Sequence, residues 1–302
     1  MAFGAAPGFG NLPQGNWSPV IFSQKVLTFF RTAAVAEAIT NTDFSGDISD
    51  FGDTVRIIKE PLITVQTYKR GKELDIQALD DAELQMVIDQ GFAYAFEVDD
   101  VERELSHINW DSLAQSSAGY ALTDKFDEEV LQYMHDNATD ATGFGSAGSP
   151  VVIGYGTTDA FTPLDAINRM ARLLDDNDIP MEGRWFLGSP EYFEKLAVED
   201  GKLIDASVTE DPESAIRSRK FVTSRMIHGF TLFKSTNNPL SSSSDVTIMA
   251  GHKSAVSTAT AITKSETTRR EKSFGTLYKG LLVYGRKVLR TEALLTGYIS
   301  FS

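Results

Sequence analysis

The sequence predicts an α+β protein, and three observations carry this prediction. Apolar side chains recur with a period of two between residues 84 and 98, interrupted only by Gln90, which is typical of a strand. They recur at helical spacing between residues 113 and 134. Beyond residue 150, shorter helix-like and strand-like segments alternate. Long strands, a long helix and an interleaved helix–strand unit together indicate the α+β class.

Composition places the chain among globular proteins and narrows its chemistry. Its 302 residues, 42% of them hydrophobic, suffice for one large domain or two modest ones. The lack of cysteine excludes disulfides, thiolate metal sites and cysteine nucleophiles, and it suits a reducing compartment. A net charge of -14 disfavours a nucleic-acid-binding surface, which needs Lys and Arg against phosphates. No apolar run approaches the roughly 20 residues that span a bilayer, so we expect no membrane partner.

The N-terminal region combines an extended arm with a helix over residues 21–40. Residues 1–20 are rich in glycine and proline, yet they include Trp17, which predicts that the arm docks on a surface. Residues 21–40 have a helical apolar pattern, and residues 41–53 are rich in turn formers.

A long hairpin is predicted next. Apolar residues on odd positions from Val55 to Val65 indicate a strand that is interrupted at Pro61. A charged turn follows at residues 69–73. The even-position pattern over residues 84–98 then predicts a strand of about 50 Å at about 3.3 Å per residue. Strands usually have about 5–6 residues, so this one is either bent or leaves the body of the protein.

The rest of the chain contains well-marked helices and strands. A helix is predicted over 101–137, with Leu122, Phe126 and Val130 on its buried stripe. Another begins after Thr162, a predicted N-cap followed by Pro163 in the first turn. The strand RWFLG at 184–188 and a helix capped at 189–190 come next, and the later segments are mostly strand-like.

The motif Gly-Phe-Gly-Ser-Ala-Gly at 143–148 has the spacing of a dinucleotide-binding loop, but its context is reversed. Such a loop follows a strand and opens a helix, so that the phosphates lie at the helix N-terminus. Here a helix is predicted before the motif and a strand after it. We interpret the motif as a connector.

No other cluster has the spacing of a catalytic or metal site. Four aspartates between residues 43 and 53 lack the pattern of a calcium loop, and the four histidines are not paired for a metal on one helix face. Acidic residues at 99–104 lie at a predicted helix start, where they complement the helix dipole. We therefore predict that the protein is not an enzyme and has no catalytic, cofactor-binding or metal-binding residues.

Taken in order, these segments resemble the major capsid protein of tailed double-stranded DNA bacteriophages, the Hong Kong 97 fold. ALTDKFDEEVL at 121–131 is similar to the spine helix of that family, and RWFLGSPEYFEKL at 184–196 to a strand and helix of its axial domain. GFTLFKSTN at 229–237 and IMAGHKSAVSTAT at 248–260 resemble the strands that follow, and YKGLLVYGRKVLRTEAL at 278–294 the closing strand. The resemblance covers nearly the whole chain, and it rests on the order of the features.

The resemblance implies a division of the chain and an assembly surface. The segments are an N-terminal arm (1–50), an extended β-hairpin loop (51–100), a peripheral domain with the spine helix (101–158), an axial domain (159–261) and the returning strands of the peripheral domain (262–302). The loop is expected to lie across a neighbouring subunit, because an isolated hairpin is marginal in water. Its charged tip would select partners by complementary charge. The candidate inter-subunit residues are Trp17, Tyr68, Lys69, Arg70, Lys72, Glu73, Leu74 and Ile76.

Two further properties occur in some members of that family. One is a covalent cross-link between a lysine of the extended loop and an asparagine of a neighbour. Lys69 and Lys72 lie near the tip of the loop, and Asn237 and Asn238 lie in a later loop. That chemistry also needs a buried carboxylate, which the sequence does not place, and lysines at a turn are usually solvated. The other is an N-terminal scaffolding segment that is cut away. Here the arm begins at once, so we expect a separate scaffolding protein to direct assembly.

The favoured interpretation is a structural virion protein that assembles as hexamers and pentamers into an icosahedral head shell around packaged DNA. Its expected partners are other copies of itself, the scaffolding protein, a portal and, where one exists, a decoration protein. The DNA would be enclosed without sequence-specific binding, and assembly would take place in the cytoplasm of the bacterial host. An encapsulin-type nanocompartment shell is the alternative within this fold. An ordinary soluble enzyme and a carbohydrate- or peptide-binding module are alternatives from other classes.

Overall fold

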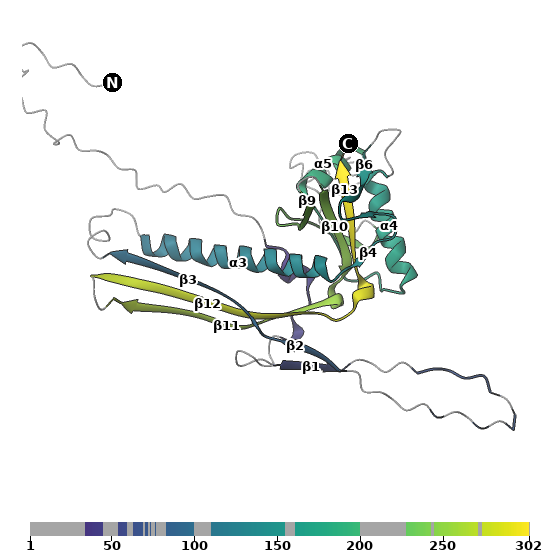
Figure 1. Cartoon of the computed structure of the whole chain (residues 1–302), viewed down its shortest axis with the longest axis horizontal. Helices are drawn as coiled ribbons and strands as arrows, with labels where there is room; N and C mark the ends of the chain where they lie inside the picture. The colour runs from purple at the N-terminus through teal and green to yellow at the C-terminus, as the bar shows by residue number, and fades with distance from the viewer. Residues whose placement is uncertain are drawn as a thin grey trace, which may run out of the picture.

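The structure is a computed structural model that describes residues 34–44, 54–58, 63–68, 70–71, 73, 76, 83–99, 110–154, 161–199, 228–242, 245–270 and 274–301. Figure 1 shows two main sheets, with one long helix beside one of them and two shorter helices against the other. The helices are α1 (Ala36–Ile39), α3 (Trp110–Asp136), α4 (Pro163–Asp176) and α5 (Pro190–Glu199), with 3-10 turns η3 (Lys253–Ala255) and η4 (Thr291–Ala293).

The larger sheet has eight strands along the path β5-β6-β13-β10-β7-β8, with β4 paired to β13 and β9 to β10. Both of its faces are covered. In β7, Phe186 packs with α4 and α5, whereas Trp185 and Leu187 pack with α3. A strand buried on both faces has a continuous apolar sequence, which explains RWFLG. The strands are β4 (Thr139–Asp140), β5 (Gly145–Ser146), β6 (Ser149–Ile153), β7 (Arg184–Gly188), β8 (Phe230–Lys234), β9 (Leu240–Ser242), β10 (Asp245–His252) and β13 (Leu294–Phe301).

The helices that cover this sheet start where the sequence predicts. Thr162 caps α4, and its Oγ1 accepts a hydrogen bond of 3.2 Å from the Asp165 backbone N–H. Ser189 serves α5 in the same way, since its Oγ accepts a bond of 3.2 Å from the Tyr192 N–H. Each bond satisfies a backbone donor that the helix leaves unpaired. Both cap predictions are confirmed.

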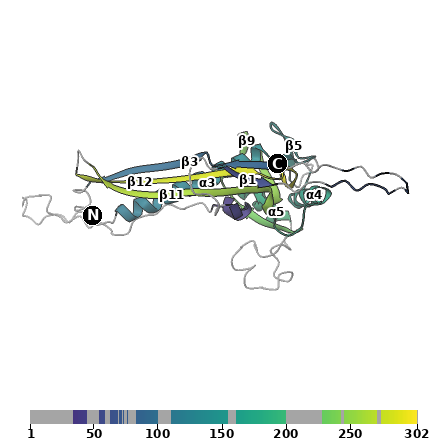
Figure 2. The same ribbon diagram turned by 90° about the horizontal axis from the view of Figure 1, so that it is seen from below.

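The second sheet has three long strands in the order β11-β12-β3, which are β11 (Val256–Arg269), β12 (Gly275–Val288) and β3 (Gln90–Asp99). Helix α3 covers one of its faces: Phe126 of α3 contacts Tyr284 of β12 with ring centroids 4.9 Å apart, and Phe92 of β3 contacts the same tyrosine at 5.8 Å. Figure 2 shows the three strands side by side along the long axis. The predicted stripe on α3 is confirmed at Phe126 and Val130, which are buried, and residues 101–109 lie outside the described residues.

The prediction of one continuous strand over residues 84–98 is wrong, although its period-two alternation is confirmed. The chain forms β2 (Glu83–Val87), which pairs with β1 (Thr54–Ile58), and then β3, which pairs with β12. The break lies at Ile88, which is fully buried and packs where β12 has Gly285: a Cβ on that glycine would lie 2.9 Å from Ile88 Cγ1. The chain leaves one sheet and joins another at this residue.

The strand pairing also bears on the implied division of the chain. Residues 90–99, assigned by the resemblance to the extended loop, lie in the three-stranded sheet. β13 belongs by the same reasoning to the returning strands, yet it pairs with β10 in the eight-stranded sheet, from Val246 opposite Ile299 to Gly251 opposite Leu294. The first predicted helix is described only over α1, because residues 21–33 lie outside the described part of the chain.

Candidate functional site

The base of the extended hairpin is a two-stranded antiparallel sheet. β1 and β2 pair from Thr54 opposite Val87 to Ile58 opposite Glu83. An ion pair between Arg56 and Glu83, with 3.6 Å between Nη1 and Oε2, adds a cross-strand contact. The described residues between the two strands extend away from the rest of the described chain (Figure 1).

This hairpin places large apolar side chains in solvent. The exposed fraction is 68% for Ile63, 92% for Val65, 74% for Tyr68 and 97% for Ile76. Single exposed apolar residues are common on protein surfaces, but a group on one projecting segment indicates an interaction site. The hairpin is therefore the strongest candidate interaction site in the described chain.

The hairpin tip is a turn at Arg70 and Gly71. Gly71 has a φ of +85°, a backbone conformation that is strained for any residue with a side chain. The space around it is open, because a Cβ there would meet nothing within 4 Å. Arg70 and Glu73 are both exposed, so a pair of opposite charges lies between the apolar residues Tyr68 and Ile76 along the chain. Among the predicted interface residues, Tyr68, Arg70, Glu73 and Ile76 lie together on this hairpin. Trp17, Lys69, Lys72 and Leu74 lie outside the described residues.

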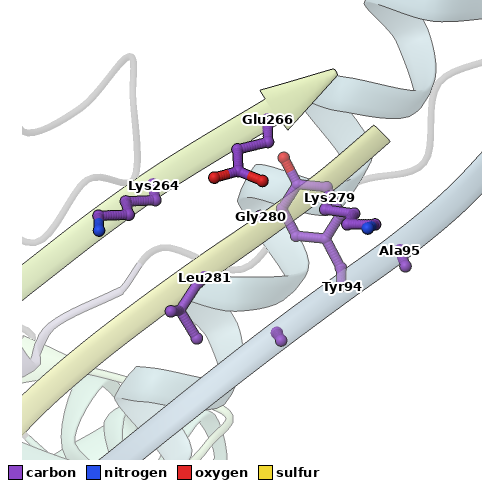
Figure 3. A pocket seen from close by; sticks show the side chains of 8 residues that line it. Tyr94, Ala95, Lys264, Glu266, Lys279, Gly280 and Leu281 are labelled. Carbon is purple, nitrogen blue, oxygen red and sulfur yellow. The ribbon is translucent and has the colours of Figure 1, made fainter. Parts of the chain in front are cut away.

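A second feature is an open groove of about 410 Å³ on the three-stranded sheet. Ala93, Tyr94 and Ala95 of β3 line it together with Lys279, Gly280 and Leu281 of β12 and with Lys264 and Glu266 of β11. Figure 3 shows these side chains arising from three adjacent strands. Ala93, Ala95, Lys279 and Leu281 alternate with the residues that face α3, so the groove lies on the opposite face.

Sequence reasoning did not identify this groove. A signal was present, because the odd-numbered neighbours of the apolar residues in β3 are mostly small, polar or acidic. Alternation alone assigns such residues to solvent. Alternation does not show that Leu281 of β12 lies between Ala93 of β3 on one side and Lys264 of β11 on the other. That arrangement depends on the pairing register of the three strands.

The residues considered for catalysis or metal binding remain dispersed. His252 contacts Ser254 through Nδ1 at 2.7 Å and the Glu182 carbonyl through Nε2 at 2.7 Å, which is a structural role. His135 lies 3.2 Å from Asp136 Oδ1 and edge-on to the Tyr298 ring. Among the described residues, no three His, Cys, Asp or Glu side chains converge on a metal position. None of the described helices is long and apolar enough to cross a membrane.

The glycine motif at 143–148 is a strand-to-strand turn. Gly145 pairs with Pro150 and Ser146 with Ser149, so β5 and β6 form a tight hairpin. Gly145 has a φ of +73°, and a Cβ there would lie 2.3 Å from the Ser149 carbonyl oxygen. The glycine is needed for the turn, and the segment directly after the motif is β6, where a phosphate loop would need a helix. The interpretation of the motif as a connector is confirmed.

Asn237 and Asn238, considered as acceptors of a cross-link, are both engaged within the chain. The Asn237 side-chain amide donates to Asp124 Oδ1 at 2.8 Å and to Asp127 Oδ2 at 3.2 Å. Asn238 is buried and donates to the Thr247 carbonyl. These bonds fix the loop after β8 against α3 and β10.

Comparisons with known proteins find relatives by structure. No family model matches the sequence, and no curated protein matches it. A structure from Mycobacterium phage Che8 is similar with a TM-score of 0.75 over 95% of this chain and 97% of that chain, at 23% sequence identity. The capsid structure of Cyanophage P-SCSP1u gives 0.69 over 95% and 93%, at 21% identity. The mature capsid of bacteriophage PhiM1 gives 0.64 over 99% of both chains, at 14% identity. At such identities the similarity establishes the fold, and this chain has the fold of phage capsid structures, as the sequence resemblance implies.

Proposed function

We propose that this chain, which folds as phage capsid structures do, is the shell protein of a virion. Copies of it assemble as hexamers and pentamers into an icosahedral head that encloses double-stranded DNA. The observation that carries the proposal is the hairpin, whose apolar residues Ile63, Val65, Tyr68 and Ile76 are exposed in the single chain. Burial on a neighbouring copy would remove this apolar area from water, at about 25 cal/mol per Å².

The charge of the chain agrees with this role. The chain has 42 acidic and 28 basic residues. This acidic balance weakens non-specific attachment to DNA, because phosphate contacts need Lys and Arg. A shell that packages a genome and later releases it benefits from such a lining. The separate scaffolding protein, the portal and the decoration protein remain proposed partners, with assembly in the bacterial cytoplasm.

A nanocompartment shell that holds enzyme cargo is the second candidate, because it would use the same fold. The two differ in their contents, so nucleic acid or protein recovered from purified particles separates them. The implied arm contact at Trp17 stays a prediction, and Trp17→Ala is expected to weaken assembly more than folding.

The test of the proposal is the double variant Leu74→Asp and Ile76→Asp. We expect a folded, soluble protein with an unchanged circular dichroism spectrum that forms no particles in electron micrographs. The matched control is Met181→Asp, because Met181 is 60% exposed but lies in the turn between α4 and β7. Particles from the double variant would refute the role of the hairpin, and an unfolded double variant would place the hairpin in the protein's own core.

A further inference from the structure

We propose that His252 locks two chain crossings between the sheets into one joint, and that this joint sets the angle between the eight-stranded and the three-stranded sheet. The consequence for assembly rests on the proposed function, because the curvature of a shell depends on the shape of each subunit. The joint itself is a property of the single chain, so it can be tested without particles.

The chain passes directly from one sheet to the other at two points. β10 leads through η3 into β11, and β12 leads through η4 into β13. Figure 1 shows β11 and β12 running crosswise to β10 and β13. Each crossing is therefore a sharp bend, and each contains a 3-10 turn. Because the same two sheets are joined twice, their relative orientation depends on how these two turns are held.

The two turns are bonded to each other. The Ala255 carbonyl at the end of η3 accepts hydrogen bonds of 2.8 Å from the Leu289 N–H and of 3.2 Å from the Arg290 N–H. Ala255 and Ala293, the last residues of η3 and η4, are buried in the same core cluster. A change in the course of one turn therefore displaces the other.

His252 holds η3 onto the eight-stranded sheet. Its pairing with Arg184 is the last one between β10 and β7. Beyond this pair, the Lys253 N–H donates to the Gly183 carbonyl at 3.1 Å, and the ring Nε2 lies 2.7 Å from the Glu182 carbonyl. The backbone bond and the ring together extend the bonding between the two strands past the end of β10, to the point where the chain bends.

The same ring orders the turn itself. Nδ1 accepts a hydrogen bond of 3.1 Å from the Ser254 N–H, so Nε2 is the nitrogen that carries the proton and donates to the Glu182 carbonyl. The side chain thereby serves as the N-cap of η3. One imidazole thus connects the segment before β7 with the backbone of η3.

Gly183 shows how closely the ring is fitted. It has a φ of +80°, and a Cβ there would lie 3.1 Å from His252 Nε2. A side chain at this position is therefore disfavoured both by the backbone conformation and by the ring. The segment before β7 is shaped to bring the Glu182 carbonyl to the imidazole.

Hydrogen exchange of the unassembled chain, measured by mass spectrometry, tests the coupling of the two crossings. His252→Ala should speed exchange of the Leu289 and Arg290 amides about tenfold. Both amides belong to the other crossing, and they bond to the Ala255 carbonyl, which is less firmly held once η3 loses the ring. The control is Lys253→Ala, an exposed change on the same turn that keeps the backbone bond and should leave this exchange unchanged.

A conservative variant separates the joint from a simple cap. His252→Asn keeps an acceptor for the Ser254 N–H, since asparagine is a strong N-cap residue. Its amide nitrogen is attached one bond earlier than Nε2 and falls short of the Glu182 carbonyl. This variant should therefore exchange as fast as His252→Ala in the crossing through η4. Unmodified exchange rates there would reduce the ring to a local cap and overturn the proposal.

The angle between the sheets is measured with two spin labels, which the natural lack of cysteine permits. Val152→Cys on β6 and Phe274→Cys directly before β12 place the labels at exposed positions on the two sheets. Pulsed electron paramagnetic resonance should give a broader distribution of label distances with His252→Asn than with the histidine. Identical distributions would contradict the proposal.

Electron microscopy tests the consequence for the shell. His252→Asn should give particles of mixed diameter where the unmodified protein gives one diameter. Particles of a single, unchanged diameter would refute the role of the joint in shell geometry but leave the shell function standing. If the unmodified protein forms no particles, the proposed function fails, whereas the exchange and distance measurements still decide whether the joint exists.

Discussion

The carboxylate of Asp127 on α3 holds the backbone of Val35 and Ala36, which precede it by 92 and 91 residues. Its Oδ1 accepts hydrogen bonds of 2.7 Å from both N–H groups. Its Oδ2 accepts a third, of 3.2 Å, from Asn237 in the loop after β8. The side chain is fully buried, so these bonds replace water completely. One carboxylate thus joins the start of α1, the long helix and the eight-stranded sheet.

The first prediction concerns this junction. Asp127→Ala should lower the free energy of unfolding by about 3 kcal/mol, because two buried backbone donors and the Asn237 amide lose a charged acceptor. Urea denaturation of the unassembled protein measures the loss. Asp124→Ala is the control: this part-buried residue accepts a hydrogen bond from the Asn237 amide and holds no backbone donor of α1, so we expect a loss below about 1 kcal/mol. Equal losses for the two variants would contradict the account.

A second prediction concerns Arg184, whose side chain is only 1% exposed. Its Nε donates to the Pro180 carbonyl at 2.9 Å and its Nη2 to Asp175 Oδ1 at 2.7 Å, so it satisfies the chain where α4 ends. Arg184→Met should lower the free energy of unfolding by about 2 kcal/mol, because the buried Ala171 carbonyl, the Pro180 carbonyl and the half-exposed Asp175 carboxylate all lose a charged donor. Arg172→Met, an exposed change on the same helix, should leave the melting temperature within about 1 °C. A similar change in melting temperature for both variants would argue against the role of the buried Arg184 network.

A third prediction concerns the contact between Tyr94 and Gly280. The tyrosine ring lies over the glycine on the neighbouring strand, and a Cβ on Gly280 would be 2.1 Å from Tyr94 Cε1 (Figure 3). Gly280→Ala should therefore cost about 1–3 kcal/mol of stability through overpacking. In the Tyr94→Ala background the same change should cost much less. A double-mutant cycle measures the coupling, and additive effects of the two changes would refute the steric explanation.

A fourth prediction concerns alkaline pH. Burial raises the pKa of Tyr284 above its usual value, and its hydroxyl is buried without a hydrogen-bond partner in the described structure. Below about pH 10 the folded and unfolded chains both keep this proton, so its contribution is constant. Above about pH 10 the unfolded chain loses the proton first, so stability falls.

Tyr284→Phe tests this sign. The variant should be as stable as the unmodified protein at pH 8, or slightly more so, because a hydroxyl without a partner has been removed. Above about pH 10 its free energy of unfolding should decline less steeply than that of the unmodified protein. Tyr68→Phe, on the exposed hairpin, serves as the matched control. Parallel declines in all three proteins would contradict the assignment.

Local signals in the sequence predicted the elements whose causes are local. The cap at Thr162 depends on a hydrogen bond from the backbone N–H of Asp165, three residues away. The strand RWFLG is buried on both faces, and its run of apolar residues indicates this directly. The period-two pattern of β3 was also legible, because alternate residues meet different surroundings.

Features set by distant residues could not be predicted in the same way. The break at Ile88 depends on Gly285, and the role of Asp127 depends on a segment about 90 residues earlier. The pairing of β13 with β10 is a contact between strands far apart in the sequence, and the apolar pattern of β13 does not identify its partner strand. For the candidate site, the exposed hairpin was predicted, but the groove required the registers of β11, β12 and β3.

The proposed function requires this chain to build a closed shell from ring-shaped capsomers. The most direct measurement is negative-stain electron microscopy of the purified protein, with its mass distribution from analytical ultracentrifugation. The account predicts closed particles, or rings of five and six subunits when closure is incomplete. A stable monomer or dimer at every concentration, even with crowding agents and divalent ions, would contradict it.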